Sequence, residues 1–174
     1  MTRFRLAIVT IAAVLVAAGA FASAAGAVEP GGHVGAIFLT DDPRLVSDTD
    51  FFQYCRPDIS KPGVYRRSCS LPFSKRLFIG YGDFETSPAK LDAVWSTIRW
   101  TAYLDGRKID LPSFGTETQT LDAYPPAGGR TAYVRQWRIT ANGIPPGKHR
   151  LRWVAAQKGF GTEDVTWTFT MRSK

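Results

Sequence analysis

The feature that most constrains this fold is an alternation of apolar and polar residues in several segments of the second half of the chain. In residues 165–172, every second side chain is apolar and the others are threonine or arginine. Residues 97–104, 132–140 and 149–155 follow the same period of two. Successive side chains of a strand point to opposite faces, so this period predicts strands buried on one face only. Such strands are typical of antiparallel sheets, and the sequence therefore predicts an all-β sandwich or barrel.

Turn signals separate these segments. Asp105-Gly106 lies between two of them, and a D-G pair in that setting is the strongest short signal for a hairpin. Asn142-Gly143 and Pro145-Pro146-Gly147 predict the turn that follows residues 132–140. Because strands joined by a turn usually pair, we expect residues 132–140 to pair with residues 149–155. Further strands are predicted over residues 33–40, 64–72 and 76–84.

One short helix is predicted near residues 88–96. Ser87 suits the N-cap position and Pro88 suits the first helical position. Leu91 and Trp95 then fall on one face of the helix. The rest of the folded chain is predicted to be strands and turns.

The first 27 residues have the layout of a secretory signal peptide. Arg3 and Arg5 form a short basic start, residues 6–28 carry no charge, and small residues cluster near the end of that run. We place cleavage after Ala27, at an A-x-A site, which leaves residues 28–174 as a single domain. An uncleaved anchor is the alternative, because the uncharged run is long enough to span a bilayer. With cleavage, we expect a secreted or cell-envelope protein that is not an integral membrane protein.

The chain has two cysteines, Cys55 and Cys69, and both follow the predicted cleavage site. An exported protein folds in an oxidising compartment, so we predict that the two are joined by a disulfide bond. The closed loop of about 15 residues would contribute about 3 kcal/mol in the chain-entropy description. The spacing matches neither a C-x-x-C redox motif nor a zinc site.

The sequence carries no complete catalytic signature. Ser87 and Lys90 fit the S-x-x-K pattern of penicillin-recognising enzymes, but the S-D-N and K-T-G motifs of those enzymes are missing from the sequence. The two histidines, His33 and His149, are not accompanied by a G-x-S-x-G nucleophile motif. We therefore predict a protein that is not an enzyme and that uses no cofactor.

The C-terminal part of the chain resembles bacterial immunoglobulin-like and fibronectin type III-like domains. The segment "IPPGKHRLRWVAAQKGFGTEDVTWTFTM", residues 144–171, is similar to the closing hairpin of those domains. The segment "YLDGRKIDL", residues 103–111, is similar to their internal D-G hairpin. The resemblance runs from about residue 97 onward and implies an antiparallel Ig-like β-sandwich. Such domains serve as adhesion modules, spacers and sugar-binding appendages, so the resemblance implies a non-catalytic binding or structural module.

Positive charge is concentrated near the C-terminus. Residues 130–174 contain nine lysines and arginines against Glu163 and Asp164. Three of these cations, Arg138, Arg150 and Arg152, lie on the polar sides of predicted strands that we expect to be neighbours. We therefore predict that these three arginines form an anion-binding face. In an exported protein we expect such a face to meet an anionic polymer, a lipid head group or an acidic protein, and not nucleic acid.

Three alternatives remain open at this stage. A carbohydrate-binding module would need exposed aromatic rings, for which Tyr103, Tyr124, Tyr133 and Phe160 are candidates. We expect a buried position for the four tryptophans on the apolar sides of strands, which are Trp100, Trp137, Trp153 and Trp167.

The other two alternatives involve metals. A copper protein would need His33 as its mature N-terminus, with a second histidine completing the site. The aspartates Asp41, Asp42, Asp48 and Asp50 offer oxygen ligands for calcium, although they do not form an EF-hand series. We favour a structure without a metal.

Overall fold

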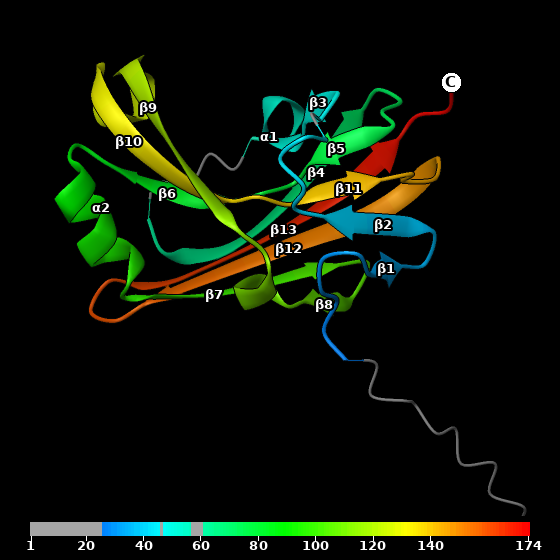
Figure 1. Cartoon of the computed structure of the whole chain (residues 1–174), viewed down its shortest axis with the longest axis horizontal. Helices are drawn as coiled ribbons and strands as arrows, with labels where there is room; N and C mark the ends of the chain where they lie inside the picture. Colours follow the sequence, from blue (N-terminus) through cyan, green and yellow to red (C-terminus); the bar gives the residue numbers. More distant parts are fainter. Residues whose placement is uncertain (1–25, 46, 57–60) are drawn as a thin grey trace, which may run out of the picture.

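The computed structural model describes residues 26–45, 47–56 and 61–174 (Figure 1). Strands take up 53% of these residues and helices 12%, and the first two sheets pack on a shared core as a β-sandwich with short helices. The predicted all-β class is therefore confirmed. Apart from its last two residues, Gly26 and Ala27, the predicted signal peptide lies outside the described residues.

The described strands form three sheets. The first sheet has the order β4 (Gly63–Leu71), β13 (Gly161–Met171), β12 (Gly147–Gln157), β7 (Ile98–Leu104) and β8 (Arg107–Ile109). The second has the order β1 (His33–Val34), β2 (Ile37–Thr40), β11 (Thr140–Asn142), β5 (Arg76–Phe78) and β3 (Thr49–Asp50). The third consists of β6 (Gly82–Glu85), β10 (Arg130–Trp137) and β9 (Thr116–Tyr124). All strand pairs are antiparallel except β13 with β4 and β3 with β5.

The helices are short. The predicted helix is α2 (Pro88–Trp95), and its N-cap Ser87 accepts a hydrogen bond from the backbone N–H of Lys90. A second helix, α1 (Phe51–Tyr54), and two 3-10 turns at Leu111–Ser113 and Pro125–Ala127 were not predicted. Each of these additional pieces spans a single turn, which is too short for the helical period to appear in the sequence.

Both predicted hairpins are confirmed. Asp105 and Gly106 have positive φ angles of 48° and 80°, which place them in the left-handed region that a two-residue turn between β7 and β8 requires. The closing hairpin pairs β12 with β13 along the full length of both strands. In Figure 1 this hairpin runs through the middle of the first sheet.

The predicted pairing of residues 132–140 with residues 149–155 is wrong. The first of these segments is divided between two sheets, because β10 pairs with β6 and β9 while β11 pairs with β2 and β5. Strand β9 has no buried residue along its nine positions, so the sequence shows no apolar face there. This unpredicted strand is one of the two partners of β10, and β12 pairs instead with β13 and β7.

One core cluster joins the first and second sheets. Trp167 and Phe169 of β13 meet the ring of Phe51 at centroid distances of 5.7 and 5.2 Å. The predicted burial of the tryptophans is confirmed for Trp153 and Trp167, whose exposed fractions are 1% and 0%. Trp100 and Trp137 are only partly buried, because they pack at the margin of the core against Trp95 of α2.

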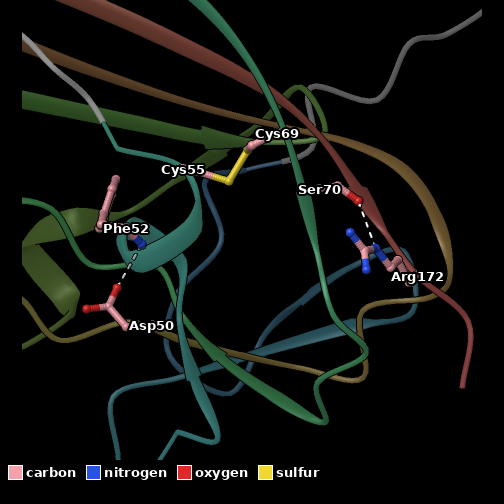
Figure 2. The surroundings of a disulfide bond; sticks show 6 residues. All are labelled: Asp50, Phe52, Cys55, Cys69, Ser70 and Arg172. Carbon is pink, nitrogen blue, oxygen red and sulfur yellow. Dashed lines mark hydrogen bonds between the residues drawn. A yellow bond between two sulfur atoms is a disulfide. The ribbon is translucent and has the colours of Figure 1, made fainter.

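The predicted disulfide bond is present. Cys55 follows α1 and is bonded to Cys69, two residues before the end of β4, with a Cα–Cα distance of 5.5 Å (Figure 2). Figure 2 also shows Asp50, whose side chain accepts a 2.8 Å hydrogen bond from the backbone N–H of Phe52 and so caps α1. The bond attaches the segment around α1 to β4, an edge strand of the first sheet.

Candidate binding face

The side of the first sheet that points away from the core carries a row of polar residues across all five strands. The strand register aligns Arg66, Thr166, Arg152, Tyr103 and Lys108 in that order. These positions alternate with buried ones such as Leu151, Trp153 and Trp167. The row lies opposite the core, because neighbouring residues of a strand point to opposite faces.

Adjacent rows add further cations and hydroxyl groups. Arg150 lies beside Thr168, and Lys148 lies beside Thr170. Arg172 follows β13 and donates a 3.2 Å hydrogen bond from Nε to the Ser70 hydroxyl (Figure 2). We call this surface the basic face. Its seven cations are Arg66, Arg99, Lys108, Lys148, Arg150, Arg152 and Arg172.

Asp164 is the one carboxylate at the described strand positions of the basic face. It accepts two 2.8 Å hydrogen bonds from Nε and Nη2 of Arg152, and Nη1 of Arg66 lies 3.8 Å away. The hydrogen bonds from Arg152 lower the pKa of Asp164, and the same contact raises the pKa of Arg152. The Arg152 guanidinium also lies over the Tyr103 ring, 5.4 Å from its centroid. One negative charge thus holds two arginines in place and leaves the face strongly positive.

Arg150 is exposed on the basic face. The nearby carboxylate, Asp105, accepts a 2.7 Å hydrogen bond from the backbone N–H of Arg150, and its other oxygen lies 2.7 Å from Nδ1 of His149. No ion pair of the Arg150 guanidinium is present among the described residues. This guanidinium is therefore available to a ligand.

Arg138 does not belong to the basic face. It lies between β10 and β11, where the chain passes from the third sheet to the second. Its Nε donates a 2.6 Å hydrogen bond to the carbonyl of Asp41, and its Nη2 lies 3.9 Å from the Asp41 carboxylate. The expected grouping of Arg138 with Arg150 and Arg152 is thus incorrect, because it depended on a strand pairing that does not form. Arg66, Lys108 and Lys148 also belong to this face, and only the register of the sheet brings them beside Arg150 and Arg152.

A hollow of about 700 Å³ lies at one end of the basic face, beside the turn between β12 and β13. Its lining includes Arg99, Lys158, the exposed ring of Phe160 and the hydroxyl-bearing Thr97 and Thr162. The described residues that line it include no carboxylate. This hollow can receive a group that is negatively charged or rich in hydrogen-bond acceptors.

The metal sites considered in the sequence are not assembled. Asp41 accepts a hydrogen bond from the backbone N–H of Gly115, Asp48 pairs with Arg76, and Asp50 caps α1. Arg44 lowers the pKa of Asp42 to about 2 through hydrogen bonds. Within residues 26–45, 47–56 and 61–174, no group of three or more His, Cys, Asp or Glu side chains could hold a metal ion.

The packing of the residues before His33 also argues against a mature chain that starts at His33. Val28 exchanges backbone hydrogen bonds with Lys108 and Asp110 and is buried, so removal of residues 28–32 would remove part of the fold. Both ring nitrogens of His149 are already occupied, Nδ1 by Asp105 and Nε2 by the carbonyl of Pro145. His149 therefore offers no open nitrogen to a copper ion.

The candidate sugar-stacking rings are spread over different surfaces. Tyr103 lies on the basic face beneath Arg152, while Tyr124 and Tyr133 belong to the third sheet. Phe160 is exposed at the turn between β12 and β13. These four rings come from two different sheets and a turn.

A second group of side chains was not predicted as a group. Tyr81 packs against Trp100, Trp153 and Trp167 on the core side of the first sheet. Burial raises the pKa of Asp83 and of Glu163, and the negative charge of Asp83 raises the pKa of Glu163 further. Each carboxylate is thus partly shielded from water where the third sheet approaches the first.

No family model matches this chain, and no curated protein matches it. Among solved structures, it is similar to PbICP-C, determined in complex with falcipain-2, with 15% sequence identity over 66% of this chain and 95% of that one and a TM-score of 0.34. It is also similar to EhICP2, a cysteine protease inhibitor from Entamoeba histolytica, with 9% identity over 63% of this chain and 95% of that one and a TM-score of 0.30. At these TM-scores the likeness carries no argument about function.

None of the helices in the described part of the chain combines the length and the apolar character needed to cross a membrane.

Proposed function

We propose that this chain is an exported bacterial protein whose residues 28–174 form one non-catalytic Ig-like binding module, and that its basic face binds anionic polymers or surfaces. The proposal of export is supported by the signal-peptide pattern of residues 1–27 and by the Cys55–Cys69 bond. We therefore propose the cell envelope or the extracellular space as the location of the protein.

The observation that carries the binding function is the charge imbalance of the basic face. Seven cations share one sheet surface with Asp164, and this single carboxylate neutralises only part of their charge. Like charges on neighbouring strands repel one another, so this arrangement costs stability in the absence of a ligand. An anionic partner would relieve that repulsion and would be drawn to the face by its positive potential.

The hydroxyl groups of the same face fit this kind of ligand. Thr168 and Thr170 alternate along β13 with buried residues and lie beside Arg150 and Lys148. Phosphate, sulfate and carboxylate groups accept hydrogen bonds from hydroxyl groups as well as from guanidinium groups. A sheet surface with both kinds of donor suits an extended polyanion better than a small neutral ligand.

Heparin, used as a model polyanion, tests the proposal. We expect the wild-type protein to bind it at low salt and to lose affinity steeply as salt rises, because exposed charges are screened over about 10 Å at 0.1 M. The triple variant Arg66→Ser/Arg150→Ser/Arg152→Ser should lose this binding. A matched control, Arg44→Ser/Lys75→Ser/Arg130→Ser, removes the same charge from positions outside the first sheet and should bind nearly as the wild type does.

Equal loss of binding in both triple variants would show that net charge alone is responsible and would contradict a specific face. A wild-type protein without affinity for heparin at low salt would overturn the proposal. Binding of uncharged glycans on an array, without binding of heparin, would favour the carbohydrate-binding alternative instead.

A further inference from the structure

The turn between β12 and β13 presents an exposed aromatic ring. Phe160 is 60% exposed in a five-residue stretch, Gln157 to Gly161, that contains two glycines with positive φ angles. At Gly161 the backbone passes so close to Pro62 that an added Cβ would lie 2.8 Å from the proline ring. The close approach of Pro62 positions the turn beside the start of β4.

A second exposed apolar side chain lies at the same end of the first sheet. Val64 of β4 is 68% exposed and pairs with Asp164 of β13. Asp164 is only four residues beyond Phe160 in the chain. The two most exposed large apolar side chains of the described residues therefore occur at one end of the basic face. Exposed apolar patches that are rimmed by polar residues mark interaction sites, including sites for membranes.

Cations surround this apolar end. Arg99 and Lys158 line the hollow beside Phe160, and neither makes an ion pair among the residues described here. Arg66 follows Val64 by two residues on the same face and has a side chain that is 62% exposed. This end of the sheet therefore presents two exposed apolar side chains with basic side chains next to them.

We infer that this end of the molecule docks onto an anionic lipid bilayer, with Phe160 entering the interface and the hollow holding a lipid phosphate between Arg99 and Lys158. The inference rests on the proposed function, because it gives the basic face a particular partner. An aromatic side chain inserts at the boundary of head groups and acyl chains, while lysines and arginines beside it meet the negative surface. A polymer in solution would use the cations but would give the exposed ring of Phe160 no apolar phase to enter.

Co-sedimentation with vesicles tests the inference, with phosphatidylcholine vesicles compared with vesicles that also contain phosphatidylglycerol. We expect the wild type to bind the anionic vesicles only. Phe160→Ser should weaken this binding about tenfold, which is the lower end expected for losing a buried phenylalanine ring. Arg99→Ser/Lys158→Ser should weaken it about 25-fold, since each basic residue near an anionic surface is worth about fivefold.

Phe73→Ser is a matched control for the aromatic substitution. Phe73 is also exposed and also lies near a cation, Lys174, but it occurs near the far end of β13, about 33 Å away along the strand. Lys75→Ser/Arg130→Ser is the control for the double charge change. Both controls should bind anionic vesicles as the wild type does.

Heparin binding separates failure of the inference from failure of the proposed function. A wild type that binds heparin but no vesicles overturns the inference and leaves the proposed function intact, as does a Phe160→Ser variant with unchanged affinity for anionic vesicles. A wild type that binds neither overturns both. Retained heparin binding with lost vesicle binding in Phe160→Ser supports the inference.

Discussion

The two faces of the first sheet are built by the same strands and differ in nearly every property. Toward the core, β12 and β13 present Leu151, Trp153 and Trp167, which are buried. Toward the outside, the residues between them are Arg150, Arg152 and Thr168. A shift of one residue in the register would exchange the two sets and place arginines in the core. Burial of the core side chains therefore fixes the register, and the register determines which cations lie on the basic face.

The largest expected effect comes from the core side. Trp167→Ala should lower the free energy of unfolding by about 3–5 kcal/mol, because it removes a fully buried ring that packs against Phe51 and Phe52. Thr168→Ala, one residue later on the outer side, should change it by less than about 0.5 kcal/mol. Urea denaturation measures both values. Similar losses in the two variants would contradict the contrast between the faces.

Removing the disulfide bond tests whether the edge strand β4 supports both the core and the basic face. The double variant Cys55→Ser/Cys69→Ser should be less stable by about 3 kcal/mol, as expected for a closed loop of about 15 residues. Because β4 contributes buried Leu71 to the core and Arg66 to the basic face, we also expect weaker heparin binding as the strand loosens. Denaturation with and without a reducing agent provides the measurement. A wild type that is equally stable when reduced would contradict this prediction.

Arg138 and Arg150 sharpen the comparison, since the same change should act on different properties. Arg138→Ser removes a charged hydrogen bond to the Asp41 carbonyl and should lower stability by about 1.5 kcal/mol while leaving heparin binding unchanged. Arg150→Ser should lower heparin affinity and alter stability by less than about 0.5 kcal/mol. Thermal unfolding and heparin affinity, measured on both variants, distinguish the two roles. A loss of heparin affinity in Arg138→Ser would show that Arg138 takes part in heparin binding.

The smallest effects are expected at Glu163 and Asp164, which are adjacent in β13 and point to opposite faces. The folded-state pKa of Asp164 is lowered by Arg152, so its contribution to stability is present above the ordinary pKa and disappears as the pH falls through the folded value. Asp164→Asn should therefore cost about 0.5–1 kcal/mol at neutral pH and nothing in strong acid. Urea denaturation at several pH values measures the difference.

Glu163 should behave with the opposite sign. Burial raises its folded-state pKa, so its contribution to stability is present below the ordinary value of 4.5 and is lost as the pH rises through the folded value. Glu163→Gln should therefore be more stable than the wild type at neutral pH, and the difference should vanish below pH 4.5. A Glu163→Gln variant that is less stable at neutral pH would show that the carboxylate has a stabilising partner.

Much of this protein was determined by features that lie within a few residues of one another. The period of two predicted which side chains of β7, β12 and β13 face the core, and Asp105-Gly106 predicted the hairpin between β7 and β8. Ser87 and Pro88 located the start of α2. These predictions succeed because strand alternation, turn geometry and helix capping depend on local backbone sterics and hydrogen bonds.

Only the tertiary structure decided which strands became neighbours. The alternation predicted one strand over residues 132–140, yet the chain changes sheets at Arg138. Polar β9 pairs with β10 without an apolar face of its own. The basic face likewise depends on β4 and β8, which bring Arg66 and Lys108 into line with Arg152. Strand neighbours are chosen by packing between residues far apart in the chain, and the period of side chains along a single strand carries no information about that choice.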